Sequence, residues 1–463
     1  MKAGGREAWK IDSCWKKERG SAILYQAVPC AMPSSNVLIY GLDDFPPWHR
    51  SLIYGLQWAM VFLPLLMILS TVTTEYLGLR GGEKVLFFQR LLVTTGGVMI
   101  LQTLWGHRYP LLDGPSSALL LSLIILAPQG MPVIQGGTIA GGLFLLLLSI
   151  FRLVRYLEPL FTDNVIGVIL MLISVTLLPY LIPMVIGAQA GHPFGEPMVF
   201  GVSVLVILVI AFFSHSLPGF PKTISLFLGI MFGTLLIGAL GRLNPEAVQE
   251  ARWFTLPQPV FPAFPRFDIS ATITFLMAYV AVIVNTIGST YSIAEVVGKE
   301  GLASRVTRGV GFTGLGGVAA GALGVIGTVS FGISPGVVLV TQVGSRFAVT
   351  VCGVLLFSLA FFQKLLAMLA MIPASTVAAA MITGLAAQVG AGIAVLTRSN
   401  KTLGGRDYMV VGIPVLFGAM VSIMPEGFFQ SFPPFVRSLL KNGLVVGIFL
   451  VLFLEHFVLR PKK

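Results

Sequence analysis

The sequence predicts an all-α polytopic membrane protein with fourteen membrane segments in two inverted seven-segment repeats. Three observations predict this fold class. Of the 463 residues, 56% are hydrophobic and only 11% are charged, whereas soluble domains carry roughly 25% charged residues. Twelve apolar runs are long enough to span a bilayer, which takes about 20 residues. Two further apolar runs are shorter, and glycine and proline interrupt them.

The long runs supply the regular segments of the predicted fold. The two short runs, "LLDGPSSALLLSLIILAP" (111–128) and "GTVSFGISPGVVLVTQVGSR" (327–346), take the third and tenth places. Because fourteen is an even number, both termini are expected on one side of the membrane. The long runs lie near residues 52–74, 86–106, 136–157, 163–183, 199–216, 222–241, 270–295, 304–323, 347–364, 373–395, 407–424 and 440–459.

The two interruptions occupy corresponding places in the two halves of the chain. Gly114 and Gly332 are 218 residues apart, and the first runs of the halves, starting near 52 and 270, are also 218 apart. Paired interrupted segments are typical of inverted-repeat transporters, and non-helical backbone at membrane depth is tolerated only where protein or a cavity covers it. The alternative is a pair of simple kinks, since glycine and proline are frequent in membrane helices.

Each interruption is therefore predicted to form a short strand followed by a half-helix, in segments 3 and 10. The free N–H groups and the positive dipole end of a half-helix N-terminus can face a ligand. In the first break, Ser116 and Ser117 supply caps or hydroxyl contacts. In the second, we expect Ser334 to be the cap and Pro335 the first helical residue.

The basic residues predict the topology. The net charge is +11, and Lys and Arg cluster in short loops, which indicates membrane orientation rather than nucleic-acid binding. With both termini in the cytoplasm, 21 of the 30 Lys and Arg residues fall on the inner side and eight on the outer side. We expect a multi-pass protein of the cytoplasmic membrane, and we interpret residues 1–49, which lack a signal-peptide apolar region, as a cytoplasmic tail.

Other chemistries find little support in the sequence. Cys14, Cys30 and Cys352 form no metal-binding or disulfide pattern, and the five histidines are scattered. The string "GVGFTG" (309–314) lies in a run of small residues, which indicates close helix packing rather than dinucleotide binding. We therefore expect neither an enzyme nor a bound metal or cofactor.

Several segments carry a family resemblance. The stretch "SPGVVLVTQVGSR" (334–346) resembles the signature of the nucleobase–ascorbate transporters, also called the xanthine/uracil permease family. Further support comes from "GLQ" (55–57), "RYPLLDGPSSA" (108–118), "IGSTYSIAEVVG" (287–298) and "FPPFVRSLLKNGLVVG" (432–447). The resemblance covers nearly the whole chain from about residue 38. The signature residues that match are Gly336, Val337, Thr341, Val343, Ser345 and Arg346.

The resemblance implies a secondary transporter for a nucleobase such as uracil or xanthine, working by alternating access between a core and a gate domain. It places the substrate between the short strands of segments 3 and 10, and it implies a homodimer. The expected division is a tail at 1–49, core parts at 50–157 (segments 1–4) and 270–364 (segments 8–11), and gate parts at 158–269 (segments 5–7) and 365–463 (segments 12–14).

The chain departs from the family at the polar site positions. Trp58 stands where a histidine follows "GLQ", and Ala118 stands where an aromatic residue is usual. Asn285 replaces the glutamate of segment 8, Ser289 replaces an aspartate or histidine one turn later, and Ile333 replaces a glutamate or glutamine. The predicted substrate-binding residues are Asn285, Ser289, Ser116, Ser117, Ala118, Gly332, Ile333, Ser334 and Gln57.

These departures leave the coupling open. Asn285 offers one acceptor and two donors but does not titrate, and its alternative role is a helix–helix hydrogen bond. Asp113, close to the first break, is the candidate for proton coupling, although a capping carboxylate is the simpler interpretation. The alternatives for the whole protein are a carrier of the same fold for another small solute or anion without proton coupling, and a membrane sensor that does not transport.

Overall fold

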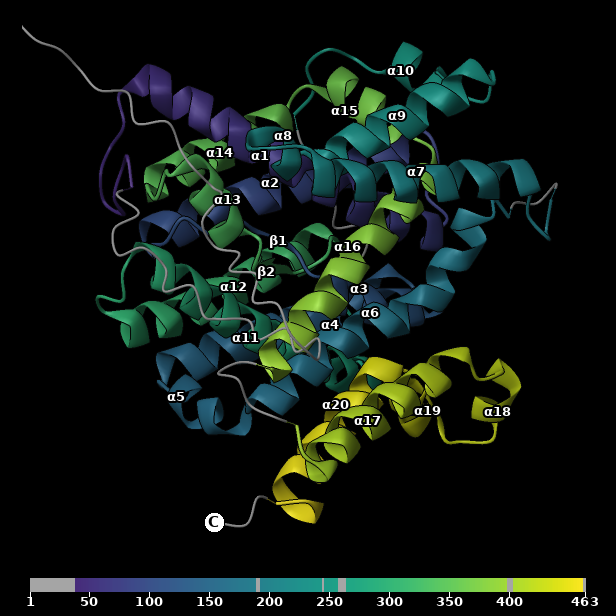
Figure 1. The fold of residues 1–463 in the computed structure, drawn as a ribbon. Helices are drawn as coiled ribbons and strands as arrows, with labels where there is room; N and C mark the ends of the chain where they lie inside the picture. The colour runs from purple at the N-terminus through teal and green to yellow at the C-terminus, as the bar shows by residue number, and fades with distance from the viewer. Residues whose placement is uncertain (1–37, 189–191, 244, 257–263, 398–402, 461–463) are drawn as a thin grey trace, which may run out of the picture. The chain divides into compact units, whose positions relative to one another are not determined.

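A computed structural model of the chain describes residues 38–188, 192–243, 245–256, 264–397 and 403–460. Most of the predicted tail, residues 1–37, therefore lies outside the described residues, as do Cys14 and Cys30. The described chain is mostly helical (Figure 1).

Eight helices of the described residues are long and apolar enough to cross a membrane. Each one coincides with a long apolar run of the sequence, which confirms a multi-pass membrane protein. They are α1 (Trp48–Tyr76), α2 (Gly82–Leu104), α4 (Met131–Ile150), α6 (Asp163–Val185), α7 (Pro197–Ser216), α11 (Ile269–Val297), α16 (Ala374–Leu396) and α17 (Gly405–Ile423).

The other predicted segments are helical but shorter, less apolar or bent. α14 (Arg346–Leu359) and α15 (Gln363–Ala370) meet at 93°. The count of fourteen membrane segments thus stays a prediction. The remaining elements are α3 (Ser117–Leu126), η1 (Ala127–Gln129), α5 (Val154–Leu157), η2 (Glu158–Leu160), α8 (Phe220–Thr223), α9 (Ser225–Ala239), α10 (Glu246–Glu250), α12 (Leu302–Leu323), α13 (Ser334–Thr341), α18 (Glu426–Gln430), α19 (Pro434–Leu440), α20 (Gly443–Phe453) and the π-helical η4 (Leu454–Val458).

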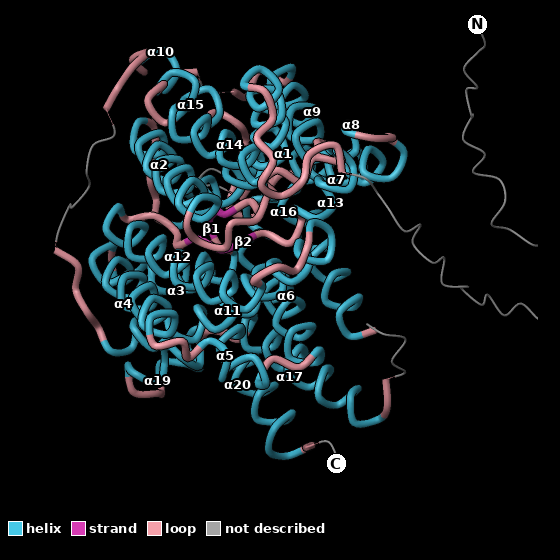
Figure 2. Tube along the Cα trace, turned by 90° about the vertical axis from the view of Figure 1, so that its left-hand side faces the viewer, coloured by secondary structure: helices cyan, strands magenta, loops and turns pink. Residues whose placement is uncertain are grey.

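Two short strands pair in the space enclosed by the helices, and we refer to this pair as the strand crossing. β1 (Asp113–Pro115) pairs antiparallel with β2 (Thr328–Ser330), with Gly114 opposite Val329. Both strands are buried, and Figure 2 shows them in magenta among the helices. α3 begins after β1 and α13 begins shortly after β2. The predicted strand and half-helix in segments 3 and 10 are therefore present.

The long helices pack in two groups. Within the first, α1, α2, α4, α11, α12 and α14 contact one another, and within the second, α6, α7, α9, α16, α17 and α20 do so. The groups meet where α1 packs on α16 and α11 packs on α20.

Small residues explain the tight contact of α4 with α12. A Cβ atom on Gly142 would lie 2.6 Å from the backbone nitrogen of Val318, and one on Gly314 would lie 2.6 Å from the carbonyl oxygen of Gly142. The glycine-rich run around "GVGFTG" thus packs two backbones closely, as the sequence predicted.

Candidate functional site

β1 and β2 are held in place by close packing as well as by the hydrogen bonds between the two strands. Beyond the three paired residues, the Phe331 N–H donates to the Leu112 carbonyl at 2.8 Å, and the Ser116 N–H donates to the Gly327 carbonyl at 2.9 Å. Phe62 of α1 lies against Gly114, where a Cβ atom would come within 2.3 Å of the Phe62 Cζ atom. A side chain at position 114 would therefore push α1 and β1 apart.

Asp113 lies at the start of β1 and is 1% exposed. One of its carboxylate oxygens accepts a hydrogen bond from the Ser330 hydroxyl at 2.6 Å, and the other lies 3.0 Å from His107 Nε2. Asp113 is thus neither a loop residue nor a helix cap, which corrects the simpler interpretation of this carboxylate. It is a buried acceptor shared by two side chains.

A backbone hydrogen bond sets the tautomer of His107. The Tyr109 N–H donates to His107 Nδ1 at 3.0 Å, so Nδ1 is an acceptor and carries no proton. The neutral ring then holds its proton on Nε2 and donates it to Asp113.

The network continues from the strands to α11. The Ser289 hydroxyl donates to the carbonyl of Ser330 at 3.0 Å and lies 3.5 Å from the Asn285 Oδ1 atom. A Cβ atom on Gly332 would lie 3.5 Å from the Ser289 Oγ atom. Asn285, Ser289 and Gly332 are therefore neighbours. The long 3.5 Å contact leaves the Asn285 amide with unused hydrogen-bonding capacity.

Of the two serines predicted as helix N-caps, Ser116 is an N-cap and Ser334 is not. Ser116 is the N-cap of α3, where its side chain accepts from the Leu119 N–H at 3.5 Å, as predicted. The expectation for Ser334 is wrong, because α13 begins at Ser334 and its N-cap, Ile333, makes no side-chain cap bond. The Ser334 hydroxyl instead accepts from the Leu112 N–H and donates to the Phe331 carbonyl, both at 3.0 Å. It ties α13 to the chain entering β1, and Pro335 is the second helical residue rather than the first.

The other predicted site residues differ in exposure. Ala118 is buried, and Gln57 and Ser117 are half-buried. Ile333 is 42% exposed, although it is the position where the family carries a polar side chain. Trp58, in the place of the family's histidine, is buried in the core.

Sequence reasoning missed Ser330 and named His107 only as a neighbour of Asp113. The signal for Ser330 was weak: it ends the β-branched stretch "TVS" and lies 217 residues from Asp113, its bonding partner. Only the strand register, which sets Asp113 opposite Ser330, brings the two side chains together.

The signature residues Ser345 and Arg346 have a structural role. The Ser345 hydroxyl donates to the Asp44 carbonyl at 2.6 Å. Arg346 forms an ion pair with Asp43 at 2.6 Å and donates to the Thr103 carbonyl at 2.8 Å. These bonds attach the segment before α1 to the start of α14, away from the strand crossing.

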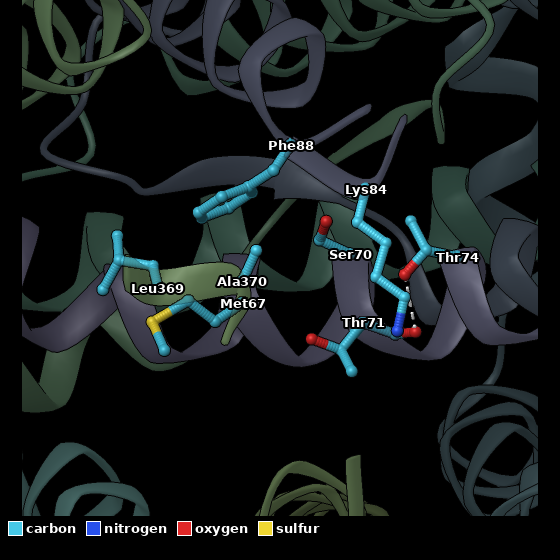
Figure 3. Close-up of a pocket in the computed structure, with 8 residues that line it drawn as sticks. All are labelled: Met67, Ser70, Thr71, Thr74, Lys84, Phe88, Leu369 and Ala370. Atoms are coloured by element: carbon cyan, nitrogen blue, oxygen red, sulfur yellow. Dashed lines mark hydrogen bonds between the residues drawn. The ribbon is translucent and has the colours of Figure 1, made fainter. Parts of the chain in front are cut away.

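A small cavity lies elsewhere, among α1, α2 and α15 (Figure 3). Serine and threonine side chains of α1 line it together with Lys84, which pairs with Glu75. Its volume of about 10 Å³ is roughly the room for one water molecule. Within the described residues, no group of three or more His, Cys, Asp or Glu side chains is placed to hold a metal ion.

Apolar helices around a buried pair of interrupted segments are the architecture of a membrane transport protein. The fold matches the transmembrane domain of a cyanobacterial bicarbonate transporter, BicA, with a TM-score of 0.61 and 14% identity, over 83% of this chain and 98% of that one. The model of the permease family matches residues 49–427, so the chain belongs to the xanthine/uracil permease family.

Two relatives match along most of their length. The chain is 26% identical over 416 residues to the uric acid transporter UacT of Escherichia coli, covering 88% of this chain and 86% of that protein. It is 25% identical over 427 residues to the nucleobase transporter PlUacP of Paenibacillus larvae, covering 89% and 96%.

Proposed function

We propose that the protein moves a nucleobase, such as uracil, xanthine or a similar purine, across the cytoplasmic membrane by alternating access. Membership of the permease family and the activities named for its relatives support this proposal. The observation that carries it is the strand crossing, which gathers Asn285, Ser289 and Gly332 at the place where two membrane segments are interrupted.

The chemistry of this site suits a planar polar solute. A nucleobase presents donors and acceptors along one edge, and a buried polar group without a partner costs about 1–3 kcal/mol. The amide of Asn285 offers both kinds of group. In this proposal Asn285, Ser289, Gln57 and Ser117 contact the base, Ala118, Gly332 and Ile333 shape the space around it, and Ser116 and Ser334 position the half-helices.

The proposed movement uses the two groups of helices. The core is assigned to 50–157 and 270–364 and the gate to 158–269 and 365–463, in agreement with the helix contacts. Corresponding half-helices α3 and α13 begin at residues 117 and 334, which is 217 residues apart and close to the spacing of the halves. This spacing supports fourteen segments in two inverted repeats, and the distribution of Lys and Arg supports both termini in the cytoplasm. A homodimer is part of the same proposal.

Asp113 is our candidate for proton coupling. It is buried, His107 and Ser330 hold it, and hydrogen bonds link it through Ser330 and Ser289 to the neighbourhood of Asn285. A change in its protonation would therefore alter the strand that carries the site. The uncoupled alternative rests on the absence of an ionisable side chain at Asn285, Ser289 and Ile333.

The test is uptake of labelled uracil, xanthine and uric acid into proteoliposomes, with and without an inward proton gradient. Gradient-driven uptake of one base supports the coupled transporter, and uptake indifferent to the gradient supports a facilitator. Folded protein that moves none of the three contradicts nucleobase transport and favours another solute or a sensor.

Asn285→Ala tests the site directly. Loss of an amide that bonds the substrate should weaken binding by about tenfold or more, since about 1.4 kcal/mol is a factor of ten. Thermal unfolding should be unchanged, because the Asn285 side chain makes only the long contact with Ser289 among the described residues. Unchanged affinity would remove Asn285 from the site.

A further inference from the structure

Three arginines lie close together where the start of α12 meets the loop that leads into β1. Arg108 lies in the loop after α2, and Arg305 and Arg308 lie in the first two turns of α12. Arg305 donates to the Arg108 carbonyl at 2.6 Å and its guanidinium lies 4.7 Å from the centre of the Tyr109 ring. Arg308 lies three residues after Arg305, on the same face of α12, and near Arg108.

Among the described residues no carboxylate is paired with this concentration of positive charge, although the Glu300 carboxylate lies near Tyr109, beside Arg305. Among the residues that the structure describes, none of the three guanidinium groups forms an ion pair with an acidic side chain. The nearby Lys299 and Glu295 pair with each other, at 2.6 Å. Arg305 also lies in the first turn of α12, where the dipole disfavours cations. An anion would relieve both repulsions.

One donor of the cluster is already removed from solvent. The Arg108 Nε atom is buried and has no hydrogen-bond partner within the described residues. Arg108 also has a φ of 56°, a backbone conformation that is uncommon for a residue other than glycine. A buried unpaired donor of a charged group is costly unless a partner is bound. The unpaired Arg108 donor therefore indicates a bound ligand, in addition to any role of Arg108 in setting the membrane topology.

An apolar surface adjoins the cluster. The Ser149 hydroxyl donates to the Thr307 carbonyl at 2.8 Å, so the end of α4 lies beside the residue before Arg308. The next residues, Ile150 and Phe151, are 61% and 65% exposed. α5, which follows them, packs on α12 (Figure 1). Charged groups that bind phosphate therefore adjoin a surface fit for acyl chains.

Aromatic side chains border the same region. Trp105, three residues before Arg108, and Tyr156 of α5 are both exposed. Tryptophan and tyrosine are enriched at the level of the lipid headgroups. The positive-inside pattern of the sequence assigns Arg108, Arg305 and Arg308 to the cytoplasmic side, where anionic lipids attract basic residues.

We propose that Arg108, Arg305 and Arg308 bind the phosphate of an anionic phospholipid, whose acyl chains lie along the exposed end of α4. Guanidinium groups suit this ligand because they present paired donors to phosphate oxygens. The occupied site would hold the loop before β1 against α12 and so fix Asp113 and His107 relative to the helix. Binding of the lipid does not depend on which solute is transported.

The experiment measures lipid binding to the purified full-length protein in a neutral detergent. Phosphatidylglycerol, phosphatidylcholine and inorganic phosphate are titrated separately, with binding and thermal unfolding as readouts. We expect phosphatidylglycerol to bind about tenfold or more tightly than phosphatidylcholine and to raise the unfolding temperature. The double variant Arg108→Gln/Arg308→Gln should lose this preference, while Arg80→Gln/Lys222→Gln, which removes two exposed charges elsewhere, should keep it.

Arg305 is left intact in the double variant because it holds the loop. If the double variant does not fold, Arg308→Gln alone serves, since its Nε atom donates only within its own helix, to the Ser304 carbonyl at 3.4 Å. Equal binding of the two lipids, or a preference that survives in the variants, would overturn the proposal. Inorganic phosphate that alone gives the same stabilisation would also overturn it, because the ligand would then be a free anion.

Discussion

The first interrupted segment, β1–α3, and the second, β2–α13, carry glycine, serine and proline at similar places, yet they are held differently. In the first, Ser116 caps its own helix, and every residue of α3 from Ala118 to Leu126 is buried. In the second, Ile333 leaves α13 without a side-chain cap, and only Ser334, Val337 and Val338 of that helix are buried. The first break is anchored on all sides, and the second is open along one face.

The two breaks also differ in the residues that they contain. The buried first break contains Asp113, the charged centre of the hydrogen-bond network. The open second break contains Gly332 and Ile333, which are both exposed, and Gly332 lies beside Ser289. Residues at similar places in the two breaks are therefore packed tightly in the first and left accessible in the second.

The largest expected effect is that of Asp113→Asn in the anchored break. The amide would present an N–H toward the Nε2 proton of His107 or lose the bond to Ser330, because Tyr109 fixes the ring tautomer. We expect a loss of about 2–3 kcal/mol of stability, as for hydrogen bonds to charged groups, and abolition of gradient-driven accumulation while exchange persists.

Accumulation and exchange of a labelled base in proteoliposomes measure this effect. The control variant is Glu83→Gln, which removes one negative charge at an exposed position. A variant Asp113→Asn that accumulates substrate at the wild-type rate would end the coupling role of this carboxylate.

The next largest expected effect is a difference in stability between substitution of a glycine in the first break and of one in the second. Gly114→Ala places a methyl group 2.3 Å from Phe62, whereas the equivalent atom on Gly336 of α13 meets nothing within 4 Å. Overpacking costs about 1–3 kcal/mol, while alanine in a helix gains roughly 0.5–1 kcal/mol over glycine. Apparent unfolding temperatures at one scan rate should therefore fall for Gly114→Ala and hold or rise for Gly336→Ala.

A second substitution checks that explanation. Phe62→Leu shortens the side chain that faces Gly114, so in the Gly114→Ala background it should recover part of the lost stability. If it lowers the unfolding temperature further, the packing of α1 against β1 is not the cause.

The serines give a smaller but more specific contrast. Ser334→Ala leaves the buried Leu112 N–H without its acceptor, which costs about 1–3 kcal/mol. Ser116→Ala removes an N-cap bond that is already long at 3.5 Å, which costs about 1 kcal/mol or less. Thermal unfolding of the two variants should show the larger drop for Ser334→Ala, and the reverse order would contradict the cross-linking role of Ser334.

The smallest effect on stability is expected from Ile333→Gln in the open break. A partly exposed position tolerates a polar side chain within about 0.5 kcal/mol, so unfolding should be nearly unchanged. The added amide would give the site the kind of group that the family carries there, and we expect tighter binding of a nucleobase in a titration. Unchanged affinity for every base tested would place Ile333 outside the substrate's reach.

Much of the fold followed from local patterns. The apolar runs predicted the long helices. The glycine, serine and proline residues that both breaks contain predicted the two strands and half-helices, because every backbone polar group inside a membrane needs a hydrogen-bond partner. The site residues near α11 were predictable only through the family resemblance. Ser330 and the role of Ser334 were not predictable, because their partners are about 220 residues away and depend on the strand register.

By itself, the sequence determined that this protein belongs in a membrane, where its chain is interrupted and to which family it belongs, because composition and spacing record those properties directly. Tertiary structure alone decided that Asp113 meets His107 and Ser330, that Ser334 is bonded to the chain entering β1, and that Arg108 lies beside the two arginines of α12. The physical reason is that pairing across the crossing strands, and the packing of α4 and α12, bring together side chains whose positions in the sequence carry no sign of one another.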